Sequence, residues 1–218
     1  MMDILRWTDP LAEGNCYVCA EGDRAVVIDP CHPEGPASLL EERGLVPEWI
    51  LLTHEHCDHM LGLEPLRHKY PEAIVLCSAP CDAGMQNKYL NMSAMMEVYL
   101  TFKGKPGAHY PPLVCSPADQ TFAEEHTMTW RGHTLRLTPL PGHTPGSTCI
   151  LLDRDTLFTG DYLIPGEAVI TRLPGGNTEI YERVARPWLS ALPPGLRICP
   201  GHGEPYALTQ EVKDTYGL

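Results

Sequence analysis

The chain has 218 residues, of which 43% are hydrophobic and 20% are charged, a composition typical of a globular protein rather than a disordered one. Its formal net charge of −12, with no run of Lys or Arg, argues against binding to nucleic acid or to an anionic membrane surface. No apolar run is long enough to span a bilayer, and residues 1–7 lack the features of a signal peptide, so we expect a cytoplasmic protein. The length predicts one domain over residues 1–218.

Nine cysteines are many for such a chain, but their odd number and the chain length argue against a disulfide scaffold. Cys16 and Cys19 lie three positions apart on a predicted strand, so their side chains face opposite sides and form no metal clip. We interpret these two thiols, like those of Cys77, Cys149 and Cys199, as small residues of the core.

The predicted elements begin with two β-rich runs, residues 15–20 and 24–29, which form a hairpin around Glu21-Gly22-Asp23. The spacing of Ser38 and Glu41 predicts a capping box that opens a short helix, and Gly44 closes this helix. After Pro47, the apolar run of residues 49–52 predicts a buried strand.

This strand leads into four candidate metal ligands, His54, His56, Asp58 and His59. If the chain stays extended, His54 and His56 project from the same face. Asp58 and His59 then lie on the turn into a helix over residues 60–68, with an interruption expected at Pro65. Such a cluster can serve two adjacent metal ions; the alternative is a polar loop with incidental histidines.

Residues 78–128 are the hardest part of the chain to interpret. After a predicted strand at residues 74–77, Met85, Met92, Met95 and Met96 occur among aromatic and apolar residues. Flexible thioethers suit an adaptable substrate wall or lid, but they suit the packing of a covering helix equally well. Whether this segment makes a dimer contact is open. The sequence leaves the oligomeric state open.

The second half is again β-rich. Residues 134–138 form a predicted strand, residues 148–152 and 156–159 form a hairpin, and residues 196–199 form the last strand. Residues 178–192 predict a helix that is broken or restarted at Pro187. Because strands alternate with helices along the chain, we expect a layered α/β architecture.

Three further candidate ligands, His143, Asp161 and His202, each follow a predicted strand and adjoin a glycine. Glycine lets the backbone turn sharply and approach a metal closely. Strand ends that converge at one rim of a sheet are common places for active sites. We therefore add these residues to the candidate site.

Together the motifs resemble those of the metallo-β-lactamase fold superfamily. The resemblance rests on His54-Glu55-His56-Cys57-Asp58-His59, on Gly-His-Thr-Pro-Gly-Ser at 142–147, on Phe-Thr-Gly-Asp at 158–161 and on Pro-Gly-His-Gly at 200–203. It extends over nearly the whole chain and is strongest to glyoxalase II (hydroxyacylglutathione hydrolase) and its small bacterial relatives. It implies a four-layer αβ/βα sandwich with the site at the edge between two sheets.

The resemblance also implies how the ligands divide between two metal ions. His54, His56 and His143 would hold one ion, Asp58, His59 and His202 would hold the other, and Asp161 would bridge both. Imidazole and carboxylate ligands suit two Zn²⁺ ions, with Fe or Mn as alternatives. A hydroxide shared by the ions would attack a carbonyl, and Asp58 would orient it or move its proton. Asp29 is either a partner of a ligand imidazole or only a turn residue before Pro30.

The expected function is the hydrolysis of a small ester or thioester by a zinc enzyme, with a small-molecule substrate. Alternatives are a lactonase or phosphodiesterase that uses the same ions, or a mononuclear-iron persulfide dioxygenase. Asp161 occupies the place of a cysteine ligand in common zinc β-lactamases, which argues against antibiotic hydrolysis, and His56 stands where flavo-diiron reductases carry a glutamate.

Several residues are left with open roles. Full-length glyoxalase II carries a glutathione-binding helical region after its last ligand, whereas only sixteen residues follow His202, which weakens the prediction of a glutathione thioester. Arg172 either contacts substrate or caps its loop. Cys57 is an outer partner of the ligands, an oxidation-sensitive thiol, or a residue without chemical role. We interpret the other histidines as surface or packing residues, namely His32, His68, His109, His126 and His133.

Overall fold

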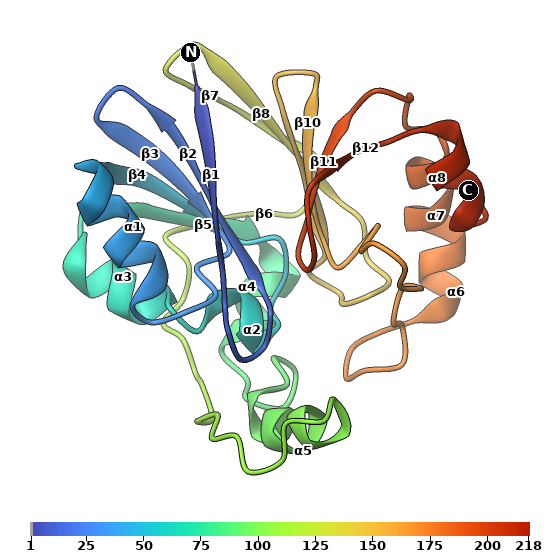
Figure 1. The fold of residues 1–218 in the computed structure, drawn as a ribbon, viewed down its shortest axis with the longest axis horizontal. Helices are drawn as coiled ribbons and strands as arrows, with labels where there is room; N and C mark the ends of the chain where they lie inside the picture. Colours follow the sequence, from blue (N-terminus) through green and yellow to red (C-terminus); the bar gives the residue numbers. More distant parts are fainter. Residues whose placement is uncertain (1) are drawn as a thin grey trace.

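The computed structural model describes residues 2–218 and contains two six-stranded sheets that pack face to face (Figure 1). The first sheet follows chain order: β1 (Asp3–Thr8), β2 (Asn15–Glu21), β3 (Arg24–Ile28), β4 (Val46–Leu51), β5 (Ile74–Ser78) and β6 (Gln120–Phe122). The second has the order β12 (Tyr206–Ala207), β11 (Arg197–Pro200), β10 (Thr156–Gly160), β9 (Thr148–Leu152), β8 (His133–Pro139) and β7 (His126–Trp130). Both sheets are mixed, because β3 to β6 run parallel in the first and β10 pairs in parallel with β11 in the second.

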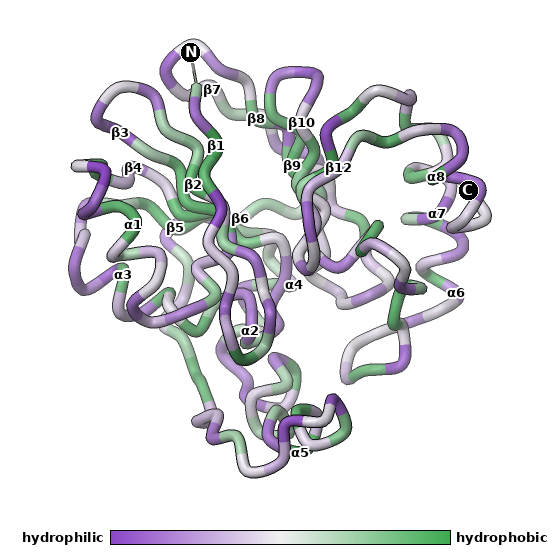
Figure 2. The backbone as a smooth tube through the Cα atoms, in the orientation of Figure 1, coloured by the Kyte–Doolittle hydropathy of each residue, from purple (hydrophilic) through white to green (hydrophobic). Residues whose placement is uncertain are grey.

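Apolar residues follow the strands of both sheets (Figure 2). The core between the sheets joins residues such as Ile28 and Leu51 of the first sheet to Leu137 and Phe158 of the second. Strand β2 contributes to both of its faces, because Cys19 lies in this central core and Cys16 lies in the core on the outer side. The predicted opposite orientation of these two thiols is therefore confirmed. All nine cysteines are buried and free of disulfide bonds in the described chain.

Helices cover the outer face of each sheet (Figure 1). Against the first sheet lie α1 (Gly35–Arg43), α3 (Leu63–Lys69) and α4 (Ala79–Met85). Against the second lie α6 (Thr178–Ile180), a π-helical turn (Tyr181–Ala185), α7 (Arg186–Ser190) and α8 (Gln210–Thr215). The predicted four-layer αβ/βα sandwich is thus confirmed. Two short elements remain: α2 (Cys57–Met60), at the rim between the sheets, and α5 (Met96–Phe102), which follows a 3₁₀ turn (Ser93–Met95). We call residues 92–102 the cap.

Two predicted helix details are wrong. Helix α1 begins at Gly35 rather than at Ser38, because Pro36 is accommodated in a first turn where no amide donor is needed. Gly44 closes it in the left-handed conformation, as predicted. The interruption after the ligand motif lies at Gly62 rather than at Pro65. The amide of Gly62 donates to the carbonyl of Pro30, and a Cβ on Gly62 would lie 2.1 Å from the carbonyl oxygen of His32.

The strands differ from the predictions in the bounds of β4 and in four strands that were not predicted. Strand β4 already includes Pro47 and ends at Leu51, so the ligand histidines lie on a loop rather than on the strand. Strand β12 follows the strand predicted to be last, and β1, β6 and β7 were not predicted. Among residues 2–218, no helix combines the length and the apolar character that a crossing of the bilayer requires.

Candidate active site

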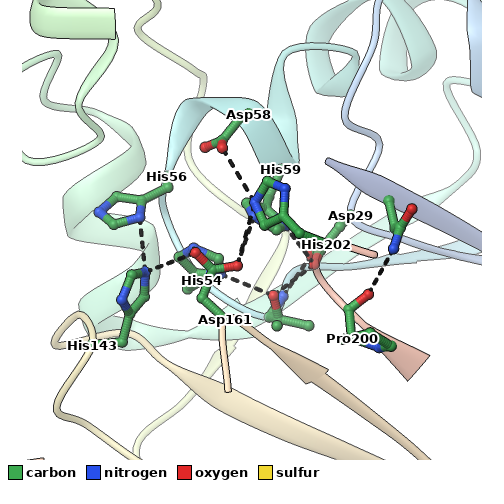
Figure 3. A network of polar contacts seen from close by, with 12 residues as sticks. Asp29, His54, His56, Asp58, His59, His143, Asp161, Pro200 and His202 are labelled. Atoms are coloured by element: carbon green, nitrogen blue, oxygen red, sulfur yellow. Dashed lines mark hydrogen bonds and ion pairs between the residues drawn. The ribbon is translucent and has the colours of Figure 1, made fainter. Parts of the chain in front are cut away.

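The seven predicted ligands meet at one rim of the sandwich, where strands of both sheets end. His54 and His56 lie on the loop after β4, and Asp58 and His59 lie on α2. The second sheet contributes the rest: His143 from the β8–β9 loop, Asp161 directly after β10, and His202 just after β11. These side chains point toward one another (Figure 3). The convergence predicted from strand ends is therefore observed.

One group of possible ligand atoms joins Asp29 to His54 and His59, and the seven predicted ligands form two further, neighbouring groups. In each group all of the atoms lie within 4.8 Å of one another; of the two neighbouring groups, the first is His54, His56, His143 and Asp161, and the second is Asp58, His59 and His202. Asp161 divides its carboxylate between them. Its Oδ2 lies 3.2 Å from His143 Nε2 and 4.0 Å from His54 Nε2. Its Oδ1 lies 3.2 Å from His59 Nε2 and 3.6 Å from His202 Nε2.

Asp29 fixes two of the histidines from behind. Its Oδ1 accepts a hydrogen bond from the Thr53 amide at 2.7 Å, and its Oδ2 accepts one from the Thr53 hydroxyl at 2.6 Å. The same Oδ2 lies 3.2 Å from His59 Nδ1. Because the Thr53 hydroxyl donates to Asp29, it can accept from Nδ1 of His54, 3.0 Å away. Asp29 also has a φ of 52°, so it acts both as a turn residue and as a partner of a ligand imidazole.

These contacts set the tautomers of three imidazoles. His143 Nδ1 lies 2.7 Å from the carbonyl oxygen of Ile170, which can only accept a hydrogen bond. His54 and His59 likewise donate from Nδ1, to Thr53 and Asp29. In each ring Nε2 therefore points into the site, where it can ligate a metal in the unprotonated state.

The residues present fit a metal ion. In the described chain, four buried atoms of the site make no hydrogen bond: Nε2 of His54, His56 and His59, and Oδ1 of Asp161. Buried polar atoms are nearly always satisfied, so a cluster of unsatisfied lone pairs needs a partner. His56 Nδ1 and His143 Nε2 lie only 3.0 Å apart, so these two ring nitrogens are close enough to bind the same cation. A cation in the first group would accept lone pairs from His54 Nε2, His143 Nε2 and one ring nitrogen of His56, whereas His59 Nε2 belongs to the second group.

Two glycines allow this close approach. A Cβ on Gly160, whose φ is 53°, would lie 2.7 Å from the Thr53 hydroxyl and 3.3 Å from His54 Nδ1. A Cβ on Gly201 would lie 2.7 Å from both Asp161 Oδ1 and His59 Cε1. Space therefore requires glycine beside Asp161 and beside His202, and at Gly160 the left-handed backbone conformation requires it as well.

Burial and charge separate the protonation behaviour of the ligands. Burial, reinforced by the neighbouring imidazoles, lowers the pKa of His56 to about 3 and that of His54 well below its ordinary value. Burial also opposes the charged form of His59, but the carboxylates of Asp161, Asp29 and Asp58 outweigh it and raise the pKa of His59 well above the ordinary value. His54 and His56 are thus neutral and ready to ligate near neutral pH.

The two acidic ligands remain ionised. Burial alone would raise the pKa of Asp58, but the hydrogen bond from His202 and the charges of His59 and His202 lower it to about 2. Asp161 is affected in the same way, since the nearby imidazoles outweigh its burial and hold its pKa well below the ordinary value. Two carboxylates among five imidazoles provide negative charge for a cation centre.

Glu55 is a residue of the site that sequence reasoning missed. Its side chain is buried, and Oε2 accepts a 2.8 Å hydrogen bond from the Thr144 hydroxyl. Its Oε1 lies 3.4 Å from the amide nitrogen of Gly146. Glu55 therefore ties the loop of His54 and His56 to the loop of His143. A carboxylate between two histidines carries no sequence signal for this role.

The residues with open roles are now placed. Cys57 is buried against Met92, Met96 and Tyr110, and burial raises the pKa of its thiol well above the ordinary value, so it packs as an apolar residue. Arg172 is exposed, makes no side-chain hydrogen bond or ion pair within residues 2–218 and so does not cap its loop, while its contact with substrate stays a prediction. The five remaining histidines join no candidate metal group in the described chain.

The methionines divide between the predicted roles. Met85 belongs to the core below the first sheet, Met95 is 45% exposed, and Met92 and Met96 line a cavity of about 130 Å³ above the ligands. The floor of this cavity includes Asp58, Asp161 and His202. This segment therefore contributes side chains both to the packed core and to the wall of the cavity.

Comparison with known proteins supports a hydrolase. The chain is 29% identical over 209 residues to the probable metallo-hydrolase YqgX of Bacillus subtilis. The aligned residues cover 94% of this chain and 92% of that protein. It is 28% identical over 187 residues to a hydroxyacylglutathione hydrolase of Anaeromyxobacter dehalogenans, covering 85% of this chain but only 60% of that longer protein.

Solved structures give the same fold. The crystal structure of the BLEG-1 B3 metallo-beta-lactamase superposes with a TM-score of 0.82 at 25% identity, covering 99% of this chain and 98% of that one. The structure of TTHA1623 in a di-iron-bound form superposes with a TM-score of 0.70 at 28% identity, covering 97% and 98%. The family model of the metallo-beta-lactamase superfamily matches residues 10–202. The chain therefore belongs to the metallo-beta-lactamase superfamily and is a hydrolase with metal-binding residues at the rim of its sandwich.

Proposed function

We propose that this protein hydrolyses a small ester or thioester with the help of two metal ions. The observation that carries the proposal is the division of the Asp161 carboxylate, whose two oxygens face two separate groups of ligand atoms. One oxygen faces His54 and His143, and the other faces His59 and His202. A carboxylate placed in this way could serve two cations, which His56 in the first group and Asp58 in the second would help to hold.

Zinc is the proposed metal. Imidazole and carboxylate donors without a thiolate suit Zn²⁺, and the tautomers described above leave Nε2 of three histidines as ligand atoms. Iron is the alternative, supported by the solved structure of a related chain that holds two iron ions. When bound, the ions supply a hydroxide at neutral pH and stabilise negative charge that develops on a carbonyl oxygen.

Asp58 is the proposed proton carrier. It is ionised at neutral pH, it lies on the floor of the cavity, and its Oδ2 lies 3.5 Å from His202 Nε2. From this position the carboxylate can hold the proton of the attacking water and deliver it to the leaving alcohol or thiol. Asp29 and Glu55 do not line the cavity, and their hydrogen bonds instead hold the loops that carry the ligands.

The test combines metal analysis with a substrate panel. We expect two equivalents of zinc or iron per chain and turnover of an acyl thioester or ester that a chelator abolishes. The panel includes a lactoyl thioester, lactones, bis-p-nitrophenyl phosphate and, because of the likeness to a B3 lactamase, a cephalosporin. A metal-loaded protein that is inert toward esters and thioesters contradicts the proposal. One iron per chain with oxygen uptake on a persulfide points to a dioxygenase instead.

A further inference from the structure

The cavity above the ligands is walled by apolar side chains from two sides. The cap contributes Met92, Met96 and Leu100, and the segment after β10 contributes Ile164, Ile170 and Leu173. The cap residues are at most 6% exposed and pack on Cys57, which sits between the ligands of the two groups. A hydrogen bond of 2.9 Å from the Cys57 amide to the carbonyl of Asn91 fixes the cap to the ligand loop. The apolar wall therefore begins directly beside the reacting centre.

The two lysines that line this cavity, Lys103 and Lys105, each lie beside a carboxylate that also lines it. Lys105 Nζ donates to the carbonyl of Leu11 at 2.6 Å and to Glu13 Oε1 at 2.7 Å. Lys103 Nζ lies 5.7 Å from the centre of the Tyr99 ring and 3.9 Å from Glu167 Oε1. Each lysine thus has a carboxylate nearby, and the chain as a whole carries a formal charge of −12. An anionic substrate finds little net attraction here.

We propose that the substrate carries an uncharged, apolar acyl chain, which lies between the cap and residues 164–173 while its carbonyl faces the ligands. This inference names the substrate class of the proposed hydrolase and rests on that proposed function. The physical reason is the transfer of chain carbons from water to an apolar wall, which contributes about 0.8 kcal/mol per methylene, or about a fourfold gain in binding. Thioethers suit such a wall because they adapt to chains of different shape.

A kinetic series tests the proposal. The substrates are the acetyl, butanoyl and hexanoyl thioesters of N-acetylcysteamine, a neutral thiol, together with S-lactoylglutathione. We expect kcat/KM to rise by up to about fourfold per methylene, and the lactoyl thioester to lie well below the hexanoyl one. A flat series, or S-lactoylglutathione as the best substrate, overturns the apolar assignment while the hydrolase function stands.

Neighbouring methionines provide matched variants. Met96→Gln places an amide in the cavity wall, whereas Met95→Gln changes a side chain that is 45% exposed and does not line the cavity. We expect Met96→Gln to flatten the chain-length series and Met95→Gln to leave it as in the unmodified protein. Equal series in both variants contradict the proposal.

A binding measurement keeps the test independent of turnover and of the stability of variants. In the metal-loaded protein with ¹³C-labelled methionine methyls, 2-heptanone presents a hexanoyl chain without a bond that hydrolysis can break. We expect it to shift the methyl signals of Met92 and Met96 but not that of Met95, and to bind more tightly than 2-butanone. Such shifts without any thioester turnover support the apolar site and contradict the hydrolase; no shift at Met92 and Met96 overturns the apolar site.

Discussion

The ligand rim and the cap lie against each other but are held in different ways. At the rim, hydrogen bonds from Asp29, Thr53 and the Ile170 carbonyl orient the imidazoles, and glycines leave no spare space. The cap packs mainly through apolar contacts, with hydrogen bonds at Ser93 and Glu97, and its helix α5 leaves Val98 56% and Phe102 86% exposed. Directional bonds fix atoms that must meet a cation, whereas a surface that receives a substrate needs only apolar contact and some freedom to adapt.

The largest expected effect comes from the removal of a ligand at the rim. His143→Ala deletes a ligand atom of the first group, so we expect the loss of one metal equivalent per chain. We also expect kcat/KM to fall by more than about 100-fold, which exceeds the fall caused by removing a hydrogen-bond partner of a ligand. Metal analysis and thioester kinetics measure both. The control is His68→Ala, an exposed histidine without hydrogen bonds or ion pairs within residues 2–218. Full metal content in the His143→Ala protein would contradict the assignment of this ligand.

The next effect concerns the support of the rim. Asp29→Asn weakens the acceptor that holds Thr53 and His59, so we expect metal affinity to fall by about 10–100-fold in a competition with a chelator. Asp153→Asn is a matched control. Asp153 also has a φ of 52°, and it accepts from the Thr134 amide and contacts His133 Nδ1, but it lies at a turn of the second sheet. Equal metal affinity in both variants would show that Asp29 is only a turn residue.

A third change separates the cap from the rim. Leu100→Ala removes a side chain that is 2% exposed, and we expect the free energy of unfolding to fall by about 2–5 kcal/mol or the cap alone to loosen. Metal affinity should stay within about twofold, because no ligand depends on Leu100 for a hydrogen bond. Urea unfolding and chelator competition test the two parts separately. A loss of metal comparable to that of Asp29→Asn would mean that the two regions are not distinct.

The smallest expected effect is a dependence of the cap on pH. A hydrogen bond from the Tyr110 amide, followed by the contact with His109, lowers the pKa of Glu97. The ionised carboxylate therefore stabilises the folded cap above its ordinary pKa, and this contribution is lost as the pH falls through the lowered value. We expect acid to shift the methyl signals of Met92 and Met96. Glu97→Gln should show the acid-like positions already at neutral pH, with metal content unchanged.

The sequence predicted the candidate ligands better than the residues that support them. Two histidines after an apolar run, two Pro-Gly-His segments and a Gly-Asp are patterns that a reader can recognise, and the structure brings all seven residues together. Thr53 and Glu55 carry no such pattern, because their partners are Asp29 and Thr144, which lie far away in the sequence. Local spacing reports what a residue type can bind, whereas long-range hydrogen bonds depend on how loops meet.

The cap was the least predictable part of the fold for a related reason. A short helix such as α5, apolar on two faces, has no clear periodicity, and its inner face is defined only by the cavity beneath it. The strands of the central sandwich were easier, because alternating or continuous apolar runs reflect burial between layers. Helix α1 began earlier than predicted because a proline in the first turn outweighed a capping-box spacing.

The position of His202 just after β11, late in the chain, has a consequence for the growing polypeptide. The ribosome delivers residues in order, so His54, His56, His143 and Asp161 have all been made while β11 is still missing. The group of Asp58, His59 and His202 is complete only after β11 has joined β10 in parallel. A nascent chain can thus bring the atoms of one candidate group together before those of the other.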